Sequence, residues 1–187
     1  MSKLFAVLLG GRPTGATIEQ HNVFFGVGEK LEELFPAIKR FWTAAPKIHI
    51  DAYMVIEQVG DYSVVPLKKN ELTDPVRGEQ RLFFVNLGGY QAGVFDEIHK
   101  KLFIVAPDMK AALLAANTDP FFSEGIRAGQ AVPHIDDKHP LDEFGDDTPL
   151  DLGEQVNPQG YVLCLNKISS GSKAYPEPFI TGFLRVA

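Results

Sequence analysis

The sequence predicts an α+β protein built from two tandem β-β-α-β-β units, and three observations support this prediction. The stretch Lys3–Gly28 returns 78 positions later as Arg81–Ala106, with 11 identities in 26 ungapped positions. An amphipathic helix pattern follows both copies, and segments of strand composition flank that helix. We therefore expect a duplicated unit with pseudo-twofold symmetry and an extra strand at the C-terminus.

Each copy is expected to open with two strands joined by a glycine-containing connection. The first strand is Leu4–Leu9 in one copy and Leu82–Leu87 in the other, and two glycines follow each of them. Because nearly every position is apolar, this strand is expected in the centre of its sheet. The second strands, His21–Val27 and His99–Val105, are rich in Phe and Val, which favour strands.

The segment after these strands predicts a helix and then a hairpin. Apolar residues recur at helical spacing over 31–42 and again over 109–116. Pro36 either kinks the first helix or begins it, because proline lacks the N–H that a helix interior needs. The alternation over 49–59, before a Gly-Asp step and the apolar segment 62–67, predicts a hairpin. In its first strand one face would carry Ile50, Ala52, Met54 and Ile56.

These patterns divide the chain into three segments. Residues 1–69 form the first repeat, 70–80 a charged linker, and 81–187 the second repeat. The second repeat contains an acidic insertion over 137–158 and an additional apolar strand over 179–186. The insertion lacks the ligand order of an EF-hand, so a solvated loop is the default interpretation.

A set of motifs occurs in both copies of the repeat: KLFAVLLGG, Gly15, Glu19-x-His21 and HIDA in the first, and RLFFVNLGG, Gly93, Glu97-x-His99 and HIDD in the second. This set resembles the uncharacterised bacterial family called Domain of Unknown Function fifteen-forty-three. The resemblance covers most of the chain and implies one or two copies of such a unit. It does not extend to the acidic insertion or the C-terminal strand, and it implies no activity, substrate or catalytic residue.

Composition narrows the classes of partner. The net charge of −6 disfavours nucleic-acid binding, which concentrates Lys and Arg on one face. The only cysteine, Cys164, is expected in the core, and a single cysteine excludes an intrachain disulfide. No segment approaches the roughly 20 apolar residues of a membrane span. We expect a cytoplasmic protein whose partner is a small molecule or a protein, including a second copy of the chain.

The two Gly-Gly-x-x-x-Gly segments are the first candidate site. Backbone N–H groups freed by glycines can bind an anion, although a phosphate loop normally leads into a helix and these segments lead into strands. The alternative is that the glycines fit a close-packed bend required by the fold. The leading hypothesis is a small-ligand-binding or protein-interaction module whose contacts are Gly10, Gly11, Arg12, Gly88, Gly89 and Tyr90.

Two further constellations carry acid, base or metal chemistry. Glu19 with His21, and Glu97 with His99, place a carboxylate beside an imidazole, the minimum of a general-base pair. The alternative is a structural role, because both copies keep the pair.

The second constellation is His-x-Asp, which points two ligands to one side of a strand. His49 with Asp51, and His134 with Asp136, are expected to meet across the pseudo-twofold axis and hold a divalent metal, with Asp137 and His139 nearby. A metal-dependent hydrolase with Glu19 or Glu97 as base is the alternative function. Satisfied polar residues at a strand entrance are the structural interpretation. No high-specificity motif such as H-E-x-x-H is present, so the sequence leaves open whether the protein is an enzyme.

Overall fold

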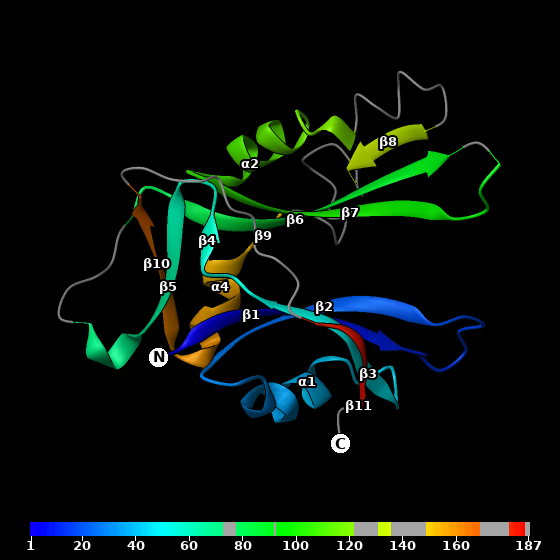
Figure 1. Cartoon of the computed structure of the whole chain (residues 1–187), viewed down its shortest axis with the longest axis horizontal. Coiled ribbons are helices and arrows are strands. Elements are labelled where there is room, and N and C mark those ends of the chain that lie inside the picture. The colour runs from blue at the N-terminus through cyan, green and yellow to red at the C-terminus, as the bar shows by residue number, and fades with distance from the viewer. Residues whose placement is uncertain (73–77, 92, 122–130, 136–148, 169–179, 186–187) are drawn as a thin grey trace. The chain divides into compact units, whose positions relative to one another are not determined.

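The computed structural model describes residues 1–72, 78–91, 93–121, 131–135, 149–168 and 180–185 (Figure 1). The fold is α+β: within these ranges there are three small antiparallel sheets and a few short helices. The chain forms two compact units. The first unit comprises Met1–Arg77 and Gly153–Ala187, and the second unit comprises Gly78–Leu152.

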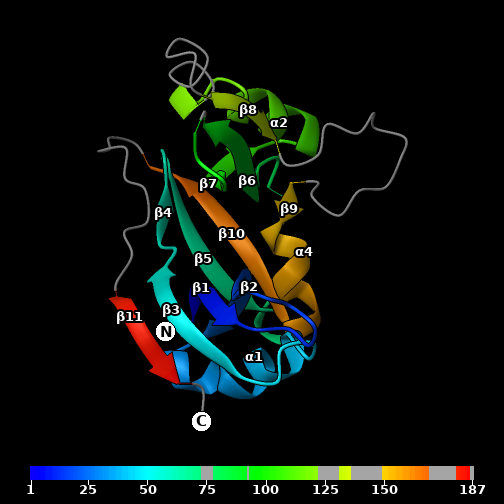
Figure 2. The same cartoon turned by 90° about the vertical axis from the view of Figure 1, so that its right-hand side faces the viewer.

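The main sheet of the first unit has the strand order β11-β3-β1-β2 (Figures 1 and 2). Its strands are β1 (Lys3–Gly11), β2 (Gln20–Gly28), β3 (Ile48–Val55) and β11 (Ile180–Arg185). The central place expected for the first strand is therefore observed for β1, which pairs with β2 on one side and β3 on the other.

A short helical segment covers one face of this sheet. The chain makes a 3₁₀ turn, η1 (Leu31–Leu34), and continues as α1 (Phe35–Phe41) with Pro36 in its first turn, where a missing N–H costs no hydrogen bond. The helix therefore restarts near Pro36 instead of running unbroken from residue 31. The residues of the core on this face are Phe5, Val7, Leu9, Phe24, Leu31, Leu34, Ile38, Ile50 and Val55.

A smaller sheet of the first unit has the order β10-β5-β4. Its strands are β4 (Gln58–Val59), β5 (Tyr62–Lys68) and β10 (Tyr161–Lys167), and the helical pieces beside them are η2 (Lys69–Glu71), α4 (Leu152–Val156) and η3 (Asn157–Gln159). β10 pairs with β5, and β11 pairs with β3. These two strands belong to the predicted second repeat, 81–187, but they pair with strands of the predicted first repeat, 1–69. Strands at the end of the chain complete the sheets of the first unit.

The second unit has β6 (Arg81–Gln91) between β7 (Glu97–Ala106) and β8 (Ala131–Ile135), and β9 (Leu150–Asp151) also pairs with β6. Its helix α2 (Met109–Ala116) packs Ala112 and Ala116 against the sheet. Most of the acidic insertion, including Asp137 and His139, lies outside the described residues, as does Asp136.

Asp108 caps α2, and its removal gives a first testable prediction. Its side chain accepts a hydrogen bond from the Ala111 N–H at 2.8 Å, which satisfies one of the unpaired donors at the helix start. We expect Asp108→Ala to lower the free energy of unfolding by about 1 kcal/mol in chemical denaturation. Asp108→Ser, which keeps a capping oxygen, should recover most of that loss. Equal stability of the Ala variant and the wild type would contradict the role of the cap.

The four glycines expected in loops lie inside strands, which corrects the sequence prediction. Gly10 and Gly11 end β1, while Gly88 and Gly89 lie in β6, and both strands are paired on two sides. The backbone groups of such strands are used by the ladders. The turn of each hairpin instead contains one left-handed glycine, Gly15 at φ 87° and Gly93 at φ 82°.

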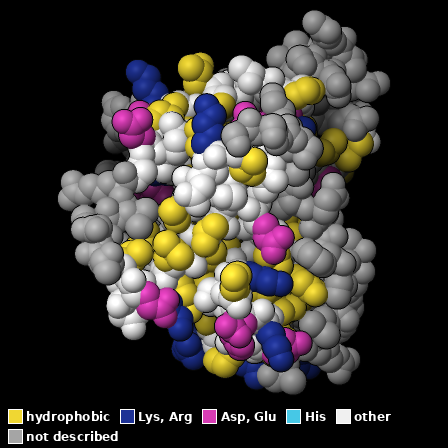
Figure 3. Space-filling model, turned by 60° about the vertical axis from the view of Figure 1, so that its left-hand side comes forward, with side chains coloured by type: hydrophobic (Ala, Val, Ile, Leu, Met, Phe, Trp, Pro, Cys, Tyr) yellow, Lys and Arg dark blue, Asp and Glu magenta, His cyan; other side chains and the backbone are white. Residues whose placement is uncertain are grey.

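None of the helices in the described ranges has the length and apolar character that crossing a membrane requires. On the face drawn in Figure 3, acidic and basic side chains are interspersed among hydrophobic ones.

Candidate metal-binding site

Gly10 is the centre of a cluster of polar side chains on the first sheet. It lies directly opposite His21 of β2 and directly opposite His49 of β3. Direct partners in a ladder share a face of the sheet, and Gly10 follows Leu9, a residue of the core. Since neighbouring residues of a strand point to opposite faces, the two histidines flank Gly10 on the face away from α1.

A β-bulge adds a carboxylate to this face. Leu9 pairs with Ile50 and Leu8 pairs with Ala52, so Asp51 is the extra residue of β3. A bulge re-aims side chains and is frequent beside functional sites. It also shifts the alternation expected for this strand: the residues of β3 in or against the core are Ile48, Ile50, Tyr53 and Val55. The predicted face with Ala52 and Met54 is therefore wrong beyond Ile50, because one inserted residue exchanges the two faces.

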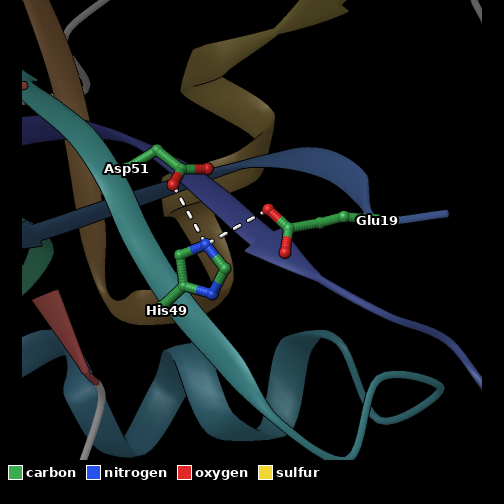
Figure 4. A group of neighbouring side chains, drawn as sticks. All are labelled: Glu19, His49 and Asp51. Carbon is green, nitrogen blue, oxygen red and sulfur yellow. Dashed lines mark ion pairs between the residues drawn. The ribbon is translucent and has the colours of Figure 1, made fainter. Parts of the chain in front are cut away.

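Glu19 completes the cluster from the connection that precedes β2. Its carboxylate Oε1 lies 3.3 Å from His49 Nε2 and 3.7 Å from His21 Nε2. The Asp51 carboxylate lies on the other side, with Oδ1 at 3.0 Å from His49 Nε2 and Oδ2 at 3.3 Å from His21 Nε2. Figure 4 shows His49 Nε2 directed between the two carboxylates. Both imidazoles and both carboxylates thus converge over one glycine.

The absence of a side chain at residue 10 makes room for this arrangement. A Cβ atom built on Gly10 would lie 2.6 Å from Asp51 Oδ2 and still closer to His49 Nε2. A Cβ atom in a folded protein does not come so close to a non-bonded atom, so either the side chains or the backbone would have to move. Gly10, which the sequence suggested as a ligand contact, thus leaves room for the side chains of His49 and Asp51.

Burial differs across the cluster. The side chain of His49 is 12% exposed and that of Asp51 27%, whereas Glu19 and His21 are 48% and 51% exposed. Asp51 Oδ2 is itself buried and accepts no hydrogen bond from the described residues, although His21 Nε2 lies within ion-pair distance of it. A buried carboxylate oxygen without a donor loses its hydration energy, so a cation beside it is stabilising.

The distances fit the coordination shell of a small metal ion. One atom each of Glu19, His49 and Asp51 lies within 4.8 Å of the others. Ligands bonded at about 2.0–2.1 Å to a tetrahedral ion stand roughly 3.4 Å apart, and the four contacts above span 3.0 to 3.7 Å. These side chains are close to a ligand set without rearrangement.

The corresponding residues of the second unit are only partly described. Gly88 is opposite His99 of β7 and His134 of β8. Glu97 Oε2 lies 3.8 Å from His99 Nε2, and Asn86 Nδ2 lies 3.1 Å from His99 Nδ1. Burial lowers the pKa of Lys101, on the same strand, below its ordinary value. Asp136 is outside the described residues, so the metal site shared by both His-x-Asp pairs stays a prediction.

The remaining residues that the sequence singled out lie in a turn and in two strands. Arg12 Nε donates a hydrogen bond to the Ala16 carbonyl at 2.9 Å, within its own turn. Tyr90 lies in β6 opposite Glu97. Cys164, expected in the core, is partly exposed on β10.

Comparisons with other proteins concern the family and the fold. The model of the family described as Domain of Unknown Function (DUF1543) matches residues 16–65, which include Glu19, His21, His49 and Asp51. The chain is similar to protein Il1583 from Idiomarina loihiensis, known from a crystal structure, with a TM-score of 0.61 and 20% identity over 100% of this chain and 99% of that chain. At this identity the likeness shows the fold alone. No curated protein matches the chain.

Proposed function

We propose that the first unit binds one divalent transition-metal ion of the zinc class through Glu19, His49 and Asp51, with His21 as the fourth ligand. Two observations carry this proposal. Glu19, His49 and Asp51 each have a ligand atom within 4.8 Å of the others. In addition, Nε2 of both His21 and His49 lies 3.0 to 3.7 Å from each of the two carboxylates, over Gly10. Mixed nitrogen and oxygen ligands suit Zn²⁺ and its neighbours. Mg²⁺ and Ca²⁺ prefer oxygen ligands only, so histidines argue against them.

A divalent cation would balance the charge of the cluster. With neutral imidazoles, the carboxylates of Glu19 and Asp51 place two negative charges around His49, and a divalent cation cancels both. Protons on both His21 and His49 would cancel the same two charges, so metal binding has to be measured directly.

A metal-dependent hydrolase is the second candidate function. The observation that favours it is the half exposure of His21. In a hydrolase, Glu19, His49 and Asp51 would hold the metal, and water would take the fourth position in place of His21. A bound metal would lower the pKa of that water to about 7 and make it a nucleophile. Turnover of p-nitrophenyl phosphate or acetate by the zinc-loaded protein, lost on chelation, would support hydrolysis; equal rates with and without metal would oppose it.

The glycine-based ligand site is less well supported than the metal. An anion cradle requires free N–H groups, and both glycine pairs lie in strands that pair on two sides.

We also infer that the two units arose by duplication. Support comes from Gly10 and Gly88, which have histidines in the same register on both neighbouring strands.

A cobalt titration tests the metal proposal. Co²⁺ added to the metal-free protein should produce the visible absorption bands of a tetrahedral site and raise the melting temperature, since a ligand at 100 times its Kd adds about 2.7 kcal/mol to stability. Asp51→Asn keeps the shape of the side chain but removes its charge, and should weaken binding at this site roughly 100-fold.

Asp61→Asn is the matched control, because Asp61 is an exposed residue of the turn between β4 and β5. It should bind Co²⁺ like the wild type. Unchanged spectra and melting temperature at saturating Co²⁺ would overturn the proposal, as would equal affinities of Asp51→Asn and the wild type.

A further inference from the structure

We infer that Gln159 closes the outer edge of β2, the edge away from β1, and so prevents a second copy of the chain from pairing with that strand. Within the described residues β2 is the last strand of its sheet, and an edge strand offers its N–H and C=O groups to other strands. The inference concerns self-association, so it does not depend on the proposed metal. It is carried by the contacts of one side-chain amide.

The amide of Gln159 bonds to β2 as the backbone of a neighbouring strand would. Its Oε1 accepts a hydrogen bond from the Val27 N–H at 3.1 Å, and its Nε2 donates to the Phe25 carbonyl at 3.1 Å. Nε2 also donates to the Gln155 carbonyl at 3.2 Å, so a turned amide would lose all three contacts. In an antiparallel pair, alternate residues of a strand direct both backbone groups away from the partner strand. Phe25 and Val27 are such alternate residues, and Gln159 therefore covers the outer edge.

The segment that carries Gln159 is held in place on both sides. Val156, at the end of α4, is fully buried. The Gly160 carbonyl accepts a hydrogen bond from the Lys69 N–H at 3.0 Å, and β10 begins at the next residue. The amide of Gln159 thus reaches β2 from a fixed backbone position.

The strand that Gln159 covers has the composition of a segment that associates with other chains. Residues 23–27 are four apolar residues of high strand propensity and one glycine, with no charge and no proline. Antiparallel pairing of two copies about Phe25 would place Val23 of each copy opposite Val27 of the other. Such a contact is the same for both copies, as a twofold interface requires, and it brings no charges together.

The second unit protects the corresponding edge by a different means. The residues 78 positions after Asn22 and Val23 are Lys100 and Lys101, in β7, which is also the last strand of its sheet in the described part of the chain. Asp119 balances the charge of Lys100, whereas Lys101 opposes pairing because its charge would lie against the added strand. In β2, Asn22 Oδ1 instead accepts a hydrogen bond from the Val23 N–H at 2.8 Å. The first unit therefore covers this edge with side-chain amides, and the second unit with lysine.

The test is the mass of the full chain in solution, measured by light scattering over a series of concentrations. We expect the wild type to be monomeric and Gln159→Ala to double in mass as the concentration rises. Gln159→Met keeps the length of the side chain without its amide, and it should behave like Gln159→Ala. The matched control is Gln155→Ala, which alters a nearby glutamine but keeps the carbonyl that Gln159 contacts. It should stay monomeric.

Amide hydrogen exchange distinguishes an opened edge from a loss of folding. The Val27 N–H of the wild type should exchange slowly at every concentration. In Gln159→Ala it should exchange faster at low concentration and more slowly at high concentration, because a second copy then replaces the missing amide. Adding Val23→Lys, which gives β2 the lysine that β7 has at residue 101, should restore the monomer. Equal masses of the wild type and both Gln159 variants, with unchanged circular dichroism, would overturn the inference, as would dimers that persist in the folded double variant.

Discussion

Gly10→Ala is expected to abolish tight metal binding at the proposed site while the chain still folds. The added Cβ would lie 2.6 Å from Asp51 Oδ2 and closer still to His49 Nε2, and these are the ends of side chains that can rotate away. Rotation relieves the clash but separates the ligands. We expect the affinity for Zn²⁺ to fall by at least about 100-fold, and the free energy of unfolding of the metal-free protein to fall by about 1–3 kcal/mol.

The measurement is competition with a chromophoric chelator, with chemical denaturation of the metal-free variant beside it. Gly60→Ala is the control for the cost of replacing a glycine. Gly60 has φ +55° and no atom within 4 Å of its added Cβ. The backbone strain in this variant should lower the free energy of unfolding by about 1–2 kcal/mol, while the side chains of the metal site stay unchanged. Tight Zn²⁺ binding by Gly10→Ala within threefold of the wild type would show that the cluster is not the site.

His49→Ala is expected to have the largest effect of any single ligand substitution. His49 is the most buried of the four side chains and contacts both carboxylates, at 3.3 Å and 3.0 Å. We expect a loss of roughly 100- to 1,000-fold in the affinity of this site, as for one ligand of a four-ligand zinc site. His21→Ala should lower the affinity for Zn²⁺ by roughly tenfold, because this side chain is half exposed and lies 3.7 Å from Glu19.

The same competition assay ranks the two variants, and His49→Gln tests whether an amide of similar length can substitute. A larger loss for His21→Ala than for His49→Ala would reverse the assignment of the two histidines. His49→Ala could lose its far-UV circular dichroism because it does not fold. In that case a His49→Gln variant that folds normally but binds Zn²⁺ weakly would still support the role of His49 as a ligand.

The strands were predictable because their signal is local. Leu4–Leu9 and His21–Val27 lie within β1 and β2, as their composition predicts. Gly15 and Gly93 have the positive φ that a turn between two strands requires, which is also a local property. The partner of β10 was not predictable in the same way. The partner of a strand depends on which strand edge lies beside it in the folded chain, and this is not a local property of the sequence. β10 pairs with β5, about 100 residues earlier in the chain.

The structure brings together two pairs of candidate residues that the sequence considered separately. The sequence joined Glu19 to His21 and His49 to Asp51, because the members of each pair are two positions apart. It did not join the two pairs, since that requires β1 to lie between β2 and β3 and Gly10 to face both histidines. Gly10 has no side chain, so the sequence pattern does not indicate that it is the neighbour of both histidines. Only the pairing of β1 with β2 and β3 shows this.

The extra residue at Asp51 lies in β3 without a direct partner in β1. If this one residue were deleted, pairing would become regular while Leu9 stayed opposite Ile50, Leu8 opposite Ala52 and Val7 opposite Tyr53. Tyr53 and Val55 would keep their places against the core, and only the carboxylate would be lost. A descendant of this protein could therefore lose the proposed metal site by shortening β3 by one residue, with the hydrophobic layer beneath α1 unchanged.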